Sequence, residues 1–151
     1  MFTFKREHIK TGRRGTACVP TEKGILIIQE RRGGHWYLPG GGARHHERSI
    51  KCATRELREE TGVRGYNPQH LIDIMGKIHI DKKGRKYRTL YKVFVFDRID
   101  SSIPRIVSEI KGIGFYTPGS DFKLSNTTRK VLDTYFDSFF EEKNVNSEKT
   151  H

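Results

Sequence analysis

Residues 40 to 63, GGGARHHERSIKCATRELREETGV, combine three successive glycines with a helix-forming run that is rich in charge. Ile50, Ala53 and Leu57 recur at the spacing of one helix face, and Gly62 is well placed to end that helix in a left-handed conformation. We therefore predict a helix over residues 50 to 61 that packs on a core, with a glycine loop at residues 39 to 42 before it.

The predicted helix carries three carboxylates on one side, because Glu56, Glu59 and Glu60 lie at i, i+3 and i+4. Like charges at i,i+4 destabilise a helix by roughly 0.2–0.5 kcal/mol per pair. A divalent cation would cancel this repulsion, and hard oxygen ligands suit Mg²⁺ or Mn²⁺ better than zinc. The alternative is a solvated helix face on which Arg55 and Arg58 are mixed with the acids.

The length of 151 residues suits one domain, and 34% hydrophobic residues suffice for a core. No apolar stretch approaches the ~18–20 residues that span a bilayer, and the first residues lack a secretory signal. We expect a single domain over residues 1–142, a disordered tail over 143–151, no membrane partner and a cytoplasmic location. Cys18 and Cys52 form no CxxC pair, so we expect two reduced thiols without a catalytic role.

The remaining pattern predicts several strands and a second helix, and so an α/β layered domain. The expected strands are residues 15–19 and 25–29 joined by a hairpin turn, then 35–38, 71–80, 87–96 and 110–116. Residues 81–86, DKKGRK, form the expected turn between two of these strands. Asn126 or Thr127 could cap a last helix that runs to about Glu141.

The charge balance favours polyanionic partners, since 29 Lys and Arg residues face 18 Asp and Glu residues. A basic group in the predicted turn region could hold a phosphate tail or RNA; a solvated loop is the alternative. Its members are Lys82, Lys83, Arg85, Lys86 and Arg88.

The full spacing of the segment is more specific than its charge. Gly41 is followed after five residues by Glu47, and seven further residues lead to Arg55-Glu56-Leu57, Glu59-Glu60 and Gly62-Val63. This pattern resembles the Nudix box of MutT-like hydrolases at every specified position. The resemblance implies an α/β/α sandwich with a central mixed β-sheet. It also implies hydrolysis of the pyrophosphate linkage of a nucleoside diphosphate joined to another moiety.

The resemblance also implies roles for individual residues. The metal ligands would be Glu56, Glu59, Glu60 and the backbone carbonyl of Gly40, with Mg²⁺ or Mn²⁺ as the cofactor. Catalytic roles would fall to Glu56, Glu59, Arg55 and Glu109, with Arg55 orienting the carboxylates and Glu47 supporting the loop and helix. Glu109 matches a distal glutamate by local spacing only, and a surface position at a strand edge is its alternative.

Three residues are candidates for binding substrate. The amides around Gly41 could approach phosphate because glycine leaves the backbone accessible. Trp36 could stack on a base or lie in the core. Asn126 resembles a base-reading asparagine of MutT-type members, and its simpler role is to cap the last helix.

Three functions remain open from the sequence. The first is Mg²⁺-dependent cleavage of a nucleoside triphosphate, such as an oxidised purine form, to monophosphate and pyrophosphate. The second is hydrolysis of RNA 5′ ends, dinucleoside polyphosphates or ADP-ribose. The third is a non-catalytic nucleotide-sensing Nudix module, which the intact Glu56, Glu59 and Glu60 disfavour. A nucleotide substrate is the expected partner, and RNA and a second copy of the chain are further candidates.

Overall fold

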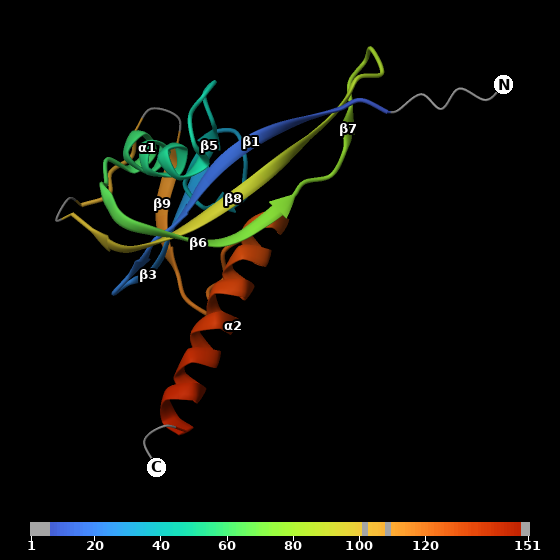
Figure 1. The fold of residues 1–151 in the computed structure, drawn as a ribbon. Helices are drawn as coiled ribbons and strands as arrows, with labels where there is room; N and C mark the ends of the chain where they lie inside the picture. Colours follow the sequence, from blue (N-terminus) through green and yellow to red (C-terminus); the bar gives the residue numbers. More distant parts are fainter. Residues whose placement is uncertain (1–6, 101–102, 108–109, 149–151) are drawn as a thin grey trace.

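The computed structural model describes residues 7–100, 103–107 and 110–148 (Figure 1). The elements follow the chain in the order β1 (Ile9–Cys18), β2 (Pro20–Thr21), β3 (Gly24–Glu30), β4 (Trp36–Tyr37), β5 (Gly40–Gly42), α1 (Ser49–Thr61), β6 (Gly65–Met75), β7 (His79–Ile80), β8 (Lys86–Ile99), β9 (Ile110–Tyr116) and α2 (Asn126–Glu148). Among the described residues, no helix has the length and apolar character needed to cross a bilayer.

The strands form two sheets. The larger has the order β5-β1-β8-β6, with β7 also paired to β8, and the smaller has the order β2-β3-β4, with β9 paired to β3. β1 and β8 are parallel over ten residue pairs, from Ile9 opposite Lys86 to Cys18 opposite Val95, whereas β8 pairs with β6 in the antiparallel sense. The sheet is therefore mixed, as expected.

The two faces of the strands bury different residues. On one side Ala17 and Phe94 pack with Ala53 and Leu57 of α1. On the other side the core contains residues of the strands and of α2: Cys18, Ile27, Val93, Val131 and Leu132. Helices thus cover both faces of the strands, which confirms the predicted α/β/α arrangement (Figure 1).

Several predicted elements match the structure closely. α1 covers Ser49–Thr61, and Gly62 ends it with φ of 76°, in the left-handed conformation that glycine adopts easily. β9 has the predicted bounds, and the expected turn separates β7 from β8. Both cysteines are free and buried, and burial raises the pKa of the Cys18 thiol to about 12, which fits the expected non-catalytic role.

Other predictions of local structure are wrong. β1 begins at Ile9 rather than residue 15, and residues 40–42 form strand β5 rather than a loop because they pair with β1. The expected strand over 71–80 is divided, since β6 ends at Met75 and β7 begins at His79.

The last helix also differs from its prediction at both ends. The backbone N–H of Thr128 donates to Ser125 Oγ at 3.2 Å, so Ser125 caps α2 and Asn126 is its first residue. α2 continues to Glu148, so residues 143–148 are helical where we expected a disordered tail. No proline or glycine interrupts the sequence before that point.

Candidate active site

The glycines of β5 bring the backbone close to α1. Gly40, Gly41 and Gly42 pair with Thr16, Gly15 and Arg14 of β1. A Cβ atom on Gly41 would lie 2.4 Å from Cδ of Glu56, so only glycine lets that carboxylate lie against the strand.

Arg55 ties the acidic side chains together. Its guanidinium donates to both oxygens of Glu47, from Nε at 2.8 Å and from NH2 at 2.9 Å, and NH1 donates to Glu56 at 2.9 Å and to Glu59 at 3.0 Å. The hydrogen bonds from Arg55, followed by that from the backbone N–H of Arg44, lower the pKa of Glu47 to about 2. The same pairing with Glu47 raises the pKa of Arg55. The predicted orienting role of Arg55 is consistent with this geometry.

Glu60 is half-buried, whereas Glu59 beside it is exposed. Glu60 Oε1 accepts a hydrogen bond from the backbone N–H of Gly40 at 2.8 Å. Burial raises the pKa of Glu60 from 4.5 to about 7, against the Gly40 hydrogen bond, and the nearby charge of Glu56 adds to the increase. A carboxylate that is costly to ionise therefore lies beside the backbone carbonyl of Gly40, which accepts from Arg14 NH2 at 3.0 Å.

A cavity of about 220 Å³ opens beside this group, and we call it the site cavity. It is smaller than the ~300–1,000 Å³ typical of pockets for drug-sized ligands, so it suits one ring system. Its lining includes the side chains of Arg14, Thr16, Glu30, Tyr37 and Ser125. Thr16 Oγ1 is buried without a hydrogen-bond partner among the described residues, so a polar ligand atom could pair with it.

The residues fit a hard divalent cation in chemistry, but their present arrangement is not a ligand cage. Among the described residues, no three His, Cys, Asp or Glu side chains are grouped so that they could hold a metal ion. Arg55 holds Glu56 and Glu59, while Glu60 turns to Gly40. The donors are all oxygens, and a cation would relieve the cost of ionising Glu60 next to Glu56. Binding would require Glu56 and Glu59 to rotate from Arg55, so the ligand set stays a prediction.

None of the predicted substrate residues Trp36, Gly41 and Asn126 lines the site cavity, although the backbone carbonyl of Trp36 accepts a hydrogen bond from the N–H of Ser125, the residue before Asn126. The ring of Trp36 packs edge-on against Phe122 with centroids 5.0 Å apart, while its neighbour Tyr37 lines the site cavity. This contact favours the core alternative for Trp36. Asn126 is exposed, and its neighbours Ser125 and Thr127 line the site cavity. Glu109 lies outside the described residues.

Sequence reasoning missed several residues that line the site cavity. Arg14 and Thr16 line the site cavity because β1 pairs with β5 and β8. The polar residues at the start of β1 do not have the pattern of a strand, so the sequence did not predict where β1 begins. Glu30, at the end of β3, lies close enough to raise the pKa of Glu60, after larger effects from burial and Glu56. The only sign of Glu30 in the sequence was its charge directly after a predicted strand that is mostly apolar.

Comparisons with known proteins agree with this geometry. A model of the NUDIX domain matches residues 11–135. The chain is 42% identical over 57 residues to the uncharacterized Nudix hydrolase YvcI of Bacillus subtilis (strain 168), a match covering 37% of this chain and 36% of that protein. It therefore spans only about a third of that curated relative's length.

Solved structures extend the likeness over most of the chain. The MutT NUDIX hydrolase from Burkholderia pseudomallei is similar with a TM-score of 0.69 and 25% identity, covering 83% of this chain and 98% of that one. A putative nudix hydrolase family member from Chromobacterium violaceum gives a TM-score of 0.60 and 26% identity, with 85% and 78% covered. Fold, acidic helix and family match together show that the chain belongs to the NUDIX domain family.

Proposed function

We propose that this chain is a Nudix pyrophosphohydrolase that cleaves a nucleoside triphosphate to monophosphate and pyrophosphate with Mg²⁺ or Mn²⁺. The observation that carries the proposal is the position of Glu60, which is half-buried between the Gly40 amide and the charge of Glu56, close to Arg14 and Glu30 of the site cavity. A raised carboxyl pKa beside a second carboxylate is common at functional sites, and a bound cation would offset the cost of ionising both groups.

The cation would be held by Glu56, Glu59, Glu60 and the Gly40 carbonyl. When bound, such a cation neutralises phosphate oxygens and lowers the pKa of a coordinated water. Arg55 would keep the carboxylates in position through its bonds to Glu47. A carboxylate must also take the proton from the attacking water, and Glu56 and Glu109 are the two candidates.

Binding of the nucleoside would fall to the site cavity. Its volume of about 220 Å³ fits one base, and Thr16 Oγ1 and Ser125 offer polar partners beside the ring of Tyr37. The guanidinium of Arg14 lies next to the Gly40 carbonyl, where it would approach the phosphates. We propose Gly41 as a backbone contact to phosphate, and Asn126 as a contact to the base from the mouth of the cavity.

The test is a panel of nucleoside triphosphates, oxidised purine forms, dinucleoside polyphosphates and ADP-ribose, incubated with Mg²⁺ or Mn²⁺ and resolved by chromatography. We expect a monophosphate and pyrophosphate from at least one triphosphate. Glu59→Gln and Glu60→Gln should each lower turnover strongly, whereas Glu22→Gln, on an exposed turn, is the charge-matched control. Absence of product from every compound would contradict the proposal and favour a sensing module.

A further inference from the structure

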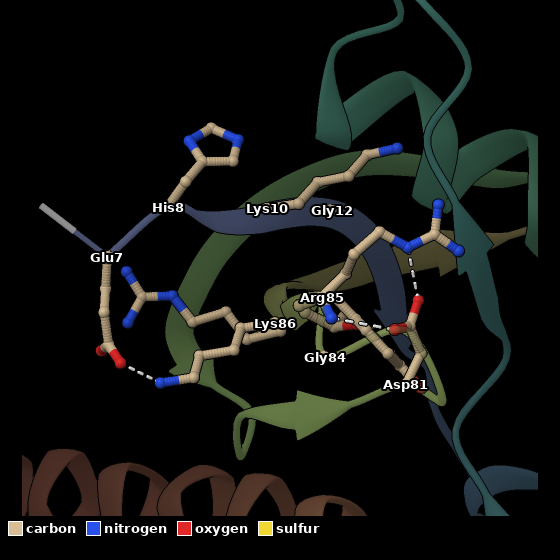
Figure 2. A pocket seen from close by; sticks show the side chains of 11 residues that line it. Glu7, His8, Lys10, Gly12, Asp81, Gly84, Arg85 and Lys86 are labelled. Atoms are coloured by element: carbon tan, nitrogen blue, oxygen red, sulfur yellow. Dashed lines mark hydrogen bonds and ion pairs between the residues drawn. The ribbon is translucent and has the colours of Figure 1, made fainter. Parts of the chain in front are cut away.

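Part of the larger sheet extends beyond the body of the domain as an arm, defined as residues 7–12 and 76–89 (Figure 1). The arm contains seven Lys and Arg residues against two acidic residues, Glu7 and Asp81. Both acids are already paired, Glu7 with Lys86 and Asp81 with Arg85 (Figure 2). The remaining positive charge is therefore available to a polyanion.

One face of the arm continues into the active site. Paired residues of neighbouring strands point to the same face, and successive residues alternate between faces. Four same-face pairs of β1 and β8 therefore form a row, which we call the track: Lys10 with Tyr87, Gly12 with Thr89, Arg14 with Tyr91 and Thr16 with Val93.

Two hollows lie along the track. A cavity of about 740 Å³ on the arm is lined by the outer two pairs, Lys10 with Tyr87 and Gly12 with Thr89. Figure 2 shows Lys10 and Gly12 at this cavity. The site cavity is lined by the inner two pairs. A Cβ atom on Gly12 would meet nothing within 4 Å, so the absent side chain leaves the track open at its middle.

The track carries two pairs in which a cation lies opposite an aromatic ring, Lys10 with Tyr87 and Arg14 with Tyr91. Tyr87 is 45% exposed. The ring of His79 stacks on the ring of Tyr87, with the ring centroids 5.4 Å apart and the ring planes at 23°. Further in, the guanidinium of Arg14 lies 5.9 Å from the ring centroid of Tyr91. Lys10 and Arg14 are about 13 Å apart along β1, from a rise of ~3.3 Å per residue.

We propose that the track binds a single-stranded nucleic acid, with its bases on Tyr87 and Tyr91 and its phosphates on Lys10 and Arg14. Aromatic rings beside cations are the surface that single strands use, because every base has a face to stack and every linkage carries a negative charge. Tyr87 is exposed, and Tyr91 is half-buried where it lines the site cavity. The direction of the strand rests on the proposed function: its 5′-terminal triphosphate nucleotide occupies the site cavity and the rest of the chain follows the track.

Binding is tested without hydrolysis, by fluorescence anisotropy of a labelled single-stranded RNA of about 12 nucleotides in EDTA at several salt concentrations. Tyr87→Ala should weaken binding at least about fivefold. Lys10→Ala should reduce the slope of log affinity against log salt by about 0.7. Gly12→Leu fills the open middle of the track and should also weaken binding, which keeps the test decisive if Tyr87→Ala does not fold.

Matched controls lie elsewhere on the surface. Tyr66→Ala removes a tyrosine that is 40% exposed at the far end of β6, and Lys130→Ala removes a charge from the exposed face of α2. Both should bind as the wild type does. Wild-type affinity in the track variants, or equal loss in the controls, would overturn the proposal. So would equal binding of duplex RNA, or binding of anionic phospholipid vesicles with the same dependence on Lys10 and Tyr87.

A second measurement separates this proposal from the proposed function. For the track variants, the ratio of kcat/KM on a 5′-triphosphate oligonucleotide to that on the free triphosphate should fall at least about fivefold. If the wild type hydrolyses neither compound while the track variants lose RNA affinity, the proposed function is wrong and the track stands. If the wild type hydrolyses triphosphates and the track variants bind RNA normally, only the track is wrong.

Discussion

Replacing Glu60 by Gln should make the metal-free protein more stable at neutral and alkaline pH. The oxygen of Gln can still accept the hydrogen bond from the Gly40 amide, which is 2.8 Å from Glu60 Oε1, so the substitution removes mainly the charge. In the wild type, burial and the charge of Glu56 raise the pKa of Glu60 from 4.5 to about 7.

The sign follows from proton linkage. A carboxyl with a raised pKa in the folded state binds its proton more tightly there than in the unfolded chain. Stability is therefore fully present below about pH 4.5 and is lost as the pH rises to about 7. Each pKa unit corresponds to about 1.36 kcal/mol, so the wild type should lose at most about 3 kcal/mol of unfolding free energy over this range.

Urea unfolding in EDTA from pH 4 to pH 8 measures the effect. We expect the curves of unfolding free energy for wild type and Glu60→Gln to separate by up to about 3 kcal/mol as the pH rises. Glu22→Gln is the control that should follow the wild type. Addition of Mg²⁺ at pH 8 should then stabilise the wild type by mass action and have little effect on Glu60→Gln. If the curves of unfolding free energy against pH were parallel for wild type and Glu60→Gln, the charge of Glu60 would not be destabilising. The argument that a cation relieves this cost would then be wrong.

Three further substitutions test the geometry. Gly41→Ala places a Cβ atom 2.4 Å from the Glu56 carboxylate, so kcat should fall at least about tenfold with little change in melting temperature. Gly42→Ala is the control, because its Cβ atom meets nothing within 4 Å, and it should keep wild-type turnover. Gly15→Ala places a Cβ 2.4 Å from the backbone oxygen of Ser49, and urea unfolding should show a loss of about 1–3 kcal/mol that Gly12→Ala, in open space, does not show. Arg55→Ala should lower the free energy of unfolding by about 2 kcal/mol. NMR titration of this variant should show the pKa of Glu47 rising from about 2 toward its ordinary value, and an unchanged pKa of Glu47 would contradict the assigned pairing.

The features that sequence reasoning predicted well depend on local patterns. The apolar spacing of Ile50, Ala53 and Leu57 with Gly62 behind it defined α1 almost to the residue. β9 was equally clear because Ile110 to Tyr116 is a short apolar run with turn residues after it. In both cases the burial of an element follows from its own residues.

The features that it missed depend on pairing between distant segments. Residues 9–14 are mostly polar and exposed, and they form a strand only because β8 lies beside them, in six of the ten residue pairs that join β1 to β8. Glycines 40–42 have little intrinsic preference for a strand, yet β1 holds them in one. The burial of Glu60 and the position of Arg14 follow from these pairings, so neither was visible in the sequence.

The most direct measurement is a crystal structure with Mn²⁺ and a non-hydrolysable triphosphate analogue, with manganese located by anomalous scattering. Our account predicts manganese bound by carboxylate oxygens of Glu56, Glu59 and Glu60 and by the Gly40 carbonyl, in contact with the phosphates. Manganese found elsewhere, with Glu56 and Glu59 still bonded to Arg55 and Glu60 still turned to the Gly40 amide, would contradict it.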